Sequence, residues 1–148
     1  MGSSDGRVVI VTGAARGLGR AHALAFAADG AKVLVNDLGV ERDGSAGTSD
    51  AANAADVADW DQAAAMVRQA VDTWGRLDTL VCNAGFLRDR MLAGMSEDEW
   101  DSVTRVHLKG HFAPARHAIE HWRQRSKAGE SVDARVINTS SGAGLAGS

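Results

Sequence analysis

Short, unbroken runs of apolar residues recur along the chain, separated by more polar segments. Such runs are typical of strands buried on both faces of a parallel sheet. Four of them predict strands, at residues 7–11, 32–37, 77–82 and 134–139. Residues 54–57 are interpreted as the end of a weaker strand, which we expect at an edge of the sheet.

Helical periodicity fills the segments between these runs. Residues 20–29 and 60–73 predict two helices, and Gly30 and Gly75 are placed to end them. Asp59 stands three residues before a glutamine, the spacing of a capping box. The expected apolar stripes consist of Ala21, Leu24, Ala25 and Ala28 in the first helix, and of Ala63, Val67, Ala70, Val71 and Trp74 in the second.

A third and longer helix is predicted after Ser96, which forms a capping-box pair with Glu99. Pro114 lies inside this helix and has no N–H, so it should leave the carbonyl of Gly110 unpaired and bend the helix there. Three of its side chains are expected to point inward: Trp100, Val103 and His107.

The order of these elements predicts one α/β domain over residues 1–148. Strands that alternate with helices become parallel neighbours through right-handed crossovers. The expected architecture is a doubly wound, Rossmann-type parallel sheet in a three-layer α/β/α arrangement. Residues 39–53 are polar and predict a loop, which is short for a crossover of a dozen or more residues. Either a helix is absent there or residues are missing from the sequence.

A glycine-rich turn joins the first strand to the first helix. It runs from Thr12 to Gly19 with the spacing G-x-x-x-G-x-G. Glycines let the backbone approach a ligand closely, and the N-terminus of the helix attracts phosphate. A tight turn without a ligand is the alternative, but the flanking strand and helix favour binding of a pyrophosphate. The candidate residues are Gly13, Arg16, Gly17, Leu18 and Gly19.

Asp37 follows the second strand, about twenty residues after the glycines. A carboxylate at this place accepts hydrogen bonds from the ribose hydroxyls of an adenosine and repels a 2′-phosphate. A solvated aspartate at a strand end is the alternative. Arg16 favours NADP instead, because a cation beside the turn could hold a 2′-phosphate. On balance the residues favour NAD over NADP.

Taken with three further motifs, these features resemble the short-chain dehydrogenase/reductase family over essentially the whole chain. The motifs are Asp56-Val57, Cys82-Asn83-Ala84-Gly85 and Asn138-Thr139-Ser140-Ser141, the second with Cys82 in place of an asparagine. The resemblance implies that Asp56 and Val57 contact the adenine and that Asn83, Ala84 and Gly85 line the cofactor. It also implies that Ser141 is the catalytic serine.

Residues 35–39, 86–92 and 105–110 are similar to one branch of that family, the (3R)-hydroxyacyl-CoA dehydrogenases of multifunctional β-oxidation enzymes and their bacterial relatives. His107 takes the place of an asparagine that supports a proton-relay water in the wider family. The resemblance therefore adds His107 to the catalytic candidates, through either its ring or only its backbone carbonyl.

The activity implied is hydride transfer between NAD(H) and a secondary alcohol or ketone, with a 3-hydroxyacyl-CoA-like substrate. A hydroxysteroid or 3-oxoacyl-carrier-protein substrate is the alternative, as is an NAD-binding fragment without catalysis. The family's Tyr-x-x-x-Lys pair would lie about a dozen residues beyond Ser141, whereas this chain contains no tyrosine and ends at Ser148. We therefore expect the N-terminal portion of a dehydrogenase, inactive alone and a homodimer or homotetramer when complete.

Composition and charge exclude several other classes of protein. A net charge of -3 provides no basic stripe for nucleic acid, and no apolar run approaches the roughly 20 residues that span a bilayer. A single cysteine and the absence of a signal-peptide pattern are typical of a cytoplasmic protein. The histidine pairs 107/111 and 117/121 have the i,i+4 spacing of metal ligands but no adjacent carboxylate, so no metal site is expected.

Overall fold

The computed structural model of the protein describes residues 2–39 and 51–146, apart from the side chain of Leu145. Four strands and the helices between them follow the predicted order. Their bounds are β1 Val8–Thr12, α1 Gly17–Ala28, β2 Lys32–Asn36, α2 Trp60–Trp74, β3 Thr79–Cys82, the 3₁₀ turn η1 Leu92–Gly94, α3 Glu97–Thr104, the π-helical turn η2 Arg105–Lys109, α4 Gly110–Lys127, β4 Arg135–Asn138 and α5 Ala143–Ala146.

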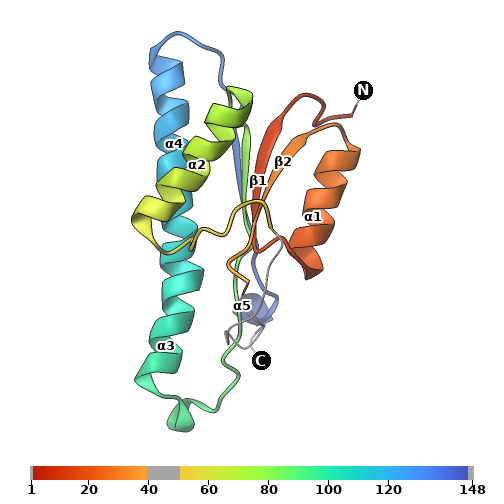
Figure 1. The fold of residues 1–148 in the computed structure, drawn as a ribbon. Helices are drawn as coiled ribbons and strands as arrows, with labels where there is room; N and C mark the ends of the chain where they lie inside the picture. The colour runs from red at the N-terminus through yellow and green to blue at the C-terminus, as the bar shows by residue number, and fades with distance from the viewer. Residues whose placement is uncertain (1, 40–50, 147–148) are drawn as a thin grey trace.

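The strands form one parallel sheet in the order β2-β1-β3-β4. Helix α1 covers one face of this sheet, while α2 and α4 cover the other (Figure 1). The predicted Rossmann-type, three-layer arrangement is therefore confirmed. The strand order reverses between β1 and β3, and the carboxyl ends of these two strands flank the place where such sheets bind ligands.

Two apolar clusters form the core, one on each face of the sheet. Alternate residues of β1 supply both, because successive side chains of a strand point to opposite faces. Ile10 packs with Met66, Leu80 and Trp122 beneath α2 and α4. On the other face, Val9, Val11, Ala14, Ala23 and Val81 form the smaller cluster beneath α1.

The buried face of α1 differs from the predicted stripe. Ala21, Leu24, Ala25 and Ala28 are all exposed, whereas Gly19 and Ala23 are buried and Phe26 packs against the core. Alanines occur on every side of this helix, so periodicity could not identify its buried face. The glycine turn decides it instead, because it holds Gly19 against the backbone of Gly13.

No strand forms at residues 54–57 of the described chain, so that expectation was wrong. A single bridge between Asn36 and Asn53 replaces it. The amide of Asn36 donates to Asn53 Oδ1 at 2.8 Å and to the carbonyl of Ala55 at 2.9 Å. Side-chain amides thus attach this segment to β2 where alanine and asparagine have little strand propensity. Most of the predicted loop, residues 40–50, lies outside the described residues, and with it the short crossover.

Helix α2 has the predicted stripe and ends at Gly75, which has φ 76°. Its capping box is only half formed. Asp59 accepts a hydrogen bond from the N–H of Gln62 at 2.9 Å, but Gln62 Oε1 accepts from the N–H of Asp56 at 2.9 Å instead of from Asp59. This helix start therefore also anchors the segment that precedes it.

The third helix begins with the predicted capping box between Ser96 and Glu99. It is interrupted at η2, one turn before the place where Pro114 was expected to bend it. Trp100 is 59% exposed and His107 is also exposed, so neither points into the core as predicted. In the sequence alone, exposed side chains at helical spacing cannot be distinguished from a buried stripe.

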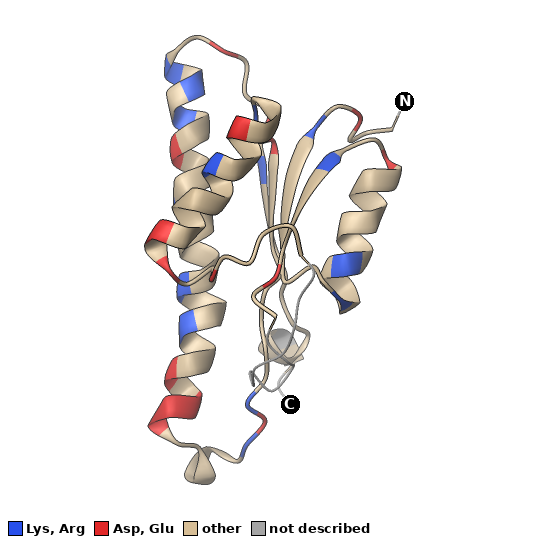
Figure 2. Cartoon of the chain, viewed as in Figure 1, with Lys and Arg blue, Asp and Glu red and all other residues tan. Residues whose placement is uncertain are grey.

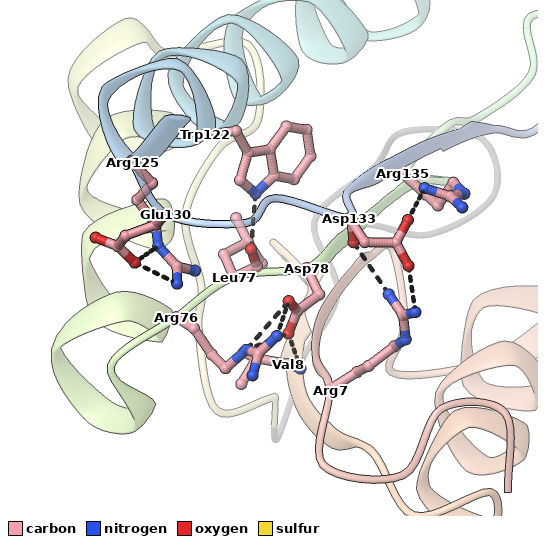
Figure 3. A network of polar contacts seen from close by, with 10 residues as sticks. All are labelled: Arg7, Val8, Arg76, Leu77, Asp78, Trp122, Arg125, Glu130, Asp133 and Arg135. Carbon is pink, nitrogen blue, oxygen red and sulfur yellow. Dashed lines mark hydrogen bonds and ion pairs between the residues drawn. The ribbon is translucent and has the colours of Figure 1, made fainter. Parts of the chain in front are cut away.

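Polar contacts fasten the amino-terminal ends of the strands (Figure 3). The buried carboxylate of Asp78 accepts a hydrogen bond from the N–H of Val8 at 2.8 Å, and the Arg76 guanidinium contacts both of its oxygens. Trp122 Nε1 donates to the carbonyl of Leu77 at 2.7 Å, which ties α4 to the start of β3. These contacts lie at the end of the sheet opposite to the carboxyl ends of the strands.

Charged side chains are interspersed over the surface. Along α4 the charged residues are mostly arginine and lysine, with Glu120 among them, whereas the start of α3 is acidic (Figure 2). Within the described residues, no helix is long and apolar enough to cross a bilayer.

Candidate functional site

A cavity of about 670 Å³ opens at the carboxyl ends of β1, β2 and β3. Four separate segments that the sequence singles out line it together. They are the glycine turn, the end of β2, residues 55–57 and residues 83–87. Side chains from α3 and η2 complete its wall.

The glycine turn brings its backbone close to the cavity. Gly13 and Gly17 have φ values of 63° and 55°, which residues with a Cβ rarely adopt. A Cβ on Gly17 would meet no atom within 4 Å, so the backbone is open there. The first N–H groups of α1 have no acceptor within the helix, and the N-cap Arg16 has no side-chain acceptor to offer them. Arg16, Leu18 and Gly19 also line the cavity.

Asp37 is held by backbone groups from two segments. Its Oδ2 accepts from the N–H of Ala15 at 3.0 Å and its Oδ1 from the N–H of Gly39 at 2.8 Å. The residue is only 7% exposed, and it lines the cavity. Each carboxylate oxygen has a second acceptor position. The predicted ribose ligand is thus a fixed, buried carboxylate.

Asp56 and Val57 lie on the same wall. Asp56 Oδ1 accepts from the N–H of Ala58 at 2.8 Å, and its Oδ2 accepts from Arg105 Nη2 at 2.6 Å. Val57 is buried and packs against Gly110. Sequence reasoning missed Arg105, because an exposed arginine on a polar helix shows no signal of its partner.

Thr12 joins the glycine turn to the segment Asn83-Ala84-Gly85. Its Oγ1 accepts from the N–H groups of Asn83 and Ala84 at 2.9 and 3.0 Å and donates to the carbonyl of Val81 at 3.3 Å. Asn83 Nδ2 returns hydrogen bonds to the carbonyls of Thr12 and Gly13. Thr12 was missed as a site residue, although it precedes the first glycine of the motif.

His107 contacts the same segment through its ring. Nε2 lies 2.9 Å from the carbonyl oxygen of Phe86 and 3.3 Å from its nitrogen, and the shorter contact requires Nε2–H as donor. A Cβ on Gly85 would lie 2.6 Å from Cε1 of the ring. The ring therefore needs a glycine beside it, and it fixes the chain at Gly85 and Phe86.

Ser141 does not join the cavity in the described structure. Its Oγ accepts from the N–H of Ala143 at 3.3 Å at the start of α5, whereas Thr139, two residues earlier, does line the cavity. The catalytic role of Ser141 stays a prediction. No group of three or more possible metal ligands occurs in the described residues.

Cys82 and His111 lie behind the cavity wall. Burial raises the pKa of the Cys82 thiol to about 11, so it is an inert packing group rather than a nucleophile. Burial lowers the pKa of His111, and a smaller electrostatic contribution from His107 acts in the same direction. Hydrogen bonds with the Asn138 side chain and the Ala84 backbone oppose this shift. Neutral His111 thus connects α4 to the ends of β3 and β4.

We expect the stability contributed by neutral His111 to be lost in mild acid. The unfolded histidine has a pKa near 6.5 and the folded one a lower pKa. The unfolded state therefore binds the proton more tightly, so the contribution is present above about pH 6.5 and disappears as the pH falls through the folded pKa. The urea midpoint of H111Q should depend less on pH between 7.5 and 5.5 than that of the unaltered chain.

An exposed histidine of α1 provides the matched control. H22Q should retain the pH dependence of the unaltered chain, since His22 lies on the surface. Identical pH dependence in all three proteins would contradict the expectation for His111.

Comparison with known proteins agrees with this geometry. The family model described as short chain dehydrogenase matches residues 7–148. The chain is 46% identical over 97% of its length to the hydroxyacyl-CoA dehydrogenase ChsB1 of Mycobacterium tuberculosis, of which it covers 49%. It is 44% identical over 97% of its length to the peroxisomal multifunctional enzyme type 2 of Mus musculus, of which it covers 20%. The chain thus spans at most about half of these relatives.

Two solved structures are similar over nearly all of the chain. One is a short chain dehydrogenase from Mycobacterium avium, with a TM-score of 0.90 and 57% identity, covering 100% of this chain and 58% of that one. The other is the 3-ketoacyl-(acyl-carrier-protein) reductase of Brucella melitensis complexed with NADH, with a TM-score of 0.83 and 26% identity, covering 99% of this chain and 61% of that one. By sequence and by fold, the chain belongs to the short chain dehydrogenase family.

Proposed function

We propose that this chain provides the NAD-binding part of a dehydrogenase that transfers hydride between NAD(H) and a secondary alcohol or ketone. The observation that carries the proposal is that one cavity at the strand ends unites the glycine turn, Asp37, Asp56-Val57 and Asn83-Gly85. These segments lie far apart in the sequence, and they meet at the switch point of the sheet, where dinucleotides bind in such folds.

The residues present fit such a cofactor. The open backbone at Gly17 and the first N–H groups of α1 would hold the pyrophosphate. Asp37 would accept hydrogen bonds from the adenosine ribose, and Asp56 and Val57 would border the adenine. Asn83, Ala84 and Gly85 would line the nicotinamide side. The nicotinamide, when bound, supplies the hydride donor or acceptor.

NAD is proposed over NADP because of Asp37. A 2′-phosphate would have to approach a buried carboxylate that two backbone N–H groups already fix in place. The carboxylate cannot rotate away without breaking both hydrogen bonds. Arg16 lines the same cavity and favours a phosphate, but its exposed side chain offers a weaker preference than the buried charge.

The proposed substrate class is a 3-hydroxyacyl-CoA or the corresponding ketone. The name of the Mycobacterium tuberculosis relative, a hydroxyacyl-CoA dehydrogenase, supports it, while the similarity to a 3-ketoacyl-(acyl-carrier-protein) reductase supports the carrier-protein alternative. Ser141 would contact the substrate oxygen, and His107 would act beside it. The proposal includes a homodimer or homotetramer and a cytoplasmic location for the complete protein.

Fluorescence titration tests the binding proposal. The chain should bind NADH, and NADPH at least about tenfold more weakly, since a buried like charge opposes the phosphate. Equal affinity for both would contradict the NAD preference, and absence of NADH binding would contradict the proposal as a whole. With NAD and a 3-hydroxyacyl-CoA, the chain alone should form no NADH, because it contains no tyrosine to serve as the family's proton donor.

A further inference from the structure

The turn η2 has an unusual hydrogen-bond pattern that determines which side chains face the cavity. The N–H of Gly110 donates to the carbonyl of Arg105, five residues earlier. In an α-helix a residue five positions after another lies roughly 140° round the axis from it. In a π-helical turn the i→i+5 hydrogen bond widens the turn, so that the two residues lie above one another. Arg105 and Gly110 therefore lie on the same side of the helix, one turn apart.

Both residues contact the same dipeptide, Asp56-Val57. Arg105 Nη2 lies 2.6 Å from Asp56 Oδ2. Gly110 is buried against Val57, and a Cβ added to Gly110 would lie 2.8 Å from Val57 Cγ2. A regular α-helix would turn one of the two residues away from this dipeptide. The π-helical turn thus attaches the helix to the cavity wall at two adjacent points.

The ion pair with Arg105 completes the set of contacts that orient the Asp56 carboxylate. The other oxygen accepts from the N–H of Ala58, while the N–H of Asp56 itself donates to Gln62. On the side of β2, the Asn36 side-chain amide donates a hydrogen bond to the carbonyl of Ala55. Backbone contacts thus fix the position of the residue, and Arg105 fixes the outer oxygen of its side chain.

We propose that Arg105 is a positioning residue for the adenine end of the cofactor site, acting through the carboxylate of Asp56. This inference rests on the proposed binding of NAD(H) in the cavity. The same five-residue turn presents His107 to Phe86 on the other wall. One irregular turn therefore supports both ends of the cavity, and Arg105 is its link to the adenine end.

Adenine-nucleotide binding tests the role of Arg105. The variants R105Q, R105K, D56N and the double variant R105Q/D56N are titrated with NADH, with AMP and with nicotinamide mononucleotide. R105Q should weaken the binding of NADH and AMP by about three- to tenfold and leave that of nicotinamide mononucleotide unchanged. R105K should keep most of the affinity that R105Q loses. In the D56N background, R105Q should change affinity by less than twofold, because the partner through which Arg105 acts has lost its charge.

R116Q is the matched control, since Arg116 is an exposed arginine of α4 paired with Glu120 on the same helix. Its NADH affinity should equal that of the unaltered chain. If the unaltered chain does not bind NADH, the proposed function fails. If it binds NADH and R105Q binds equally well, or if R105Q weakens binding just as much in the D56N background, the role of Arg105 is overturned. Should R105Q not fold, R105M, which keeps the apolar stem, replaces it with the same expected loss.

Discussion

Replacing Asp37 by serine should weaken NADH binding by one to two orders of magnitude and remove the preference over NADPH. Hydrogen bonds to a charged group contribute about 1.5–3 kcal/mol each, so the net loss of one ribose contact accounts for such an effect. The change also removes the acceptor that fixes Ala15 and Gly39. NADPH should lose far less affinity, because the repulsion between the carboxylate and the 2′-phosphate disappears at the same time.

Parallel fluorescence titrations of D37S with NADH and NADPH measure this switch. D72S is the matched control, because Asp72 lies exposed on α2 and does not line the cofactor cavity. Its affinities should match those of the unaltered chain. A D37S variant that keeps a tenfold preference for NADH would show that another group discriminates against the phosphate. Far-ultraviolet circular dichroism on each sample separates lost binding from lost folding.

The sequence was sufficient to predict those parts of the fold that depend on local pattern. The continuous apolar run at β1 predicted a strand buried on both faces, and Gly75 predicted the end of α2. Asp37 could be placed in the site because its distance from the glycine turn is set by one helix and one strand. In each case the relevant physics lies within a few residues or within a single βαβ unit.

Features that depend on contacts between distant segments were missed. The phase of α1 follows from the fit of Gly19 against Gly13, which an alanine-rich helix does not reveal. The attachment of residues 53–55 by Asn36 required knowledge of two side-chain amides across the chain. The position of the helix interruption was also missed. Pro114 suggested a break near Gly110, whereas the π-helical turn begins at Arg105, where the helix meets Asp56.

The site shows the same division. Thr12 was overlooked because a threonine at a strand end has many uses, and only the positions of Asn83 and Ala84 reveal its three hydrogen bonds. Ser141 was selected by its place in a motif, yet its hydroxyl contacts the N–H of Ala143 outside the cavity lining. Motifs therefore identified the segments of the site, and tertiary contacts determined which side chains of each segment face the cavity.

A methyl group at Gly19 should destabilise the chain more than one at any glycine with open space around it. Its Cβ would lie 2.2 Å from the carbonyl oxygen of Gly13 and 2.9 Å from the Cα of Ala14. Both are backbone atoms, so the start of α1 would have to move away from the turn. Overpacking of this kind costs about 1–3 kcal/mol, and we expect G19A to lie at the upper end of that range. The displaced turn should also lose most of its NADH affinity.

Urea unfolding of G19A, G17A and G94A separates crowding from backbone conformation. Gly94 has open space around it and is expected to tolerate alanine within about 0.5 kcal/mol. Gly17 has equal space but φ 55°, so G17A should cost about 1–2 kcal/mol through left-handed strain alone. If G19A proved as stable as G94A, the close packing of α1 on the turn would not hold in solution. If G19A loses more stability than G17A, the role of Gly19, the third glycine of the motif, is close packing of the helix. Gly17, the second glycine, then provides the open backbone that would face the cofactor.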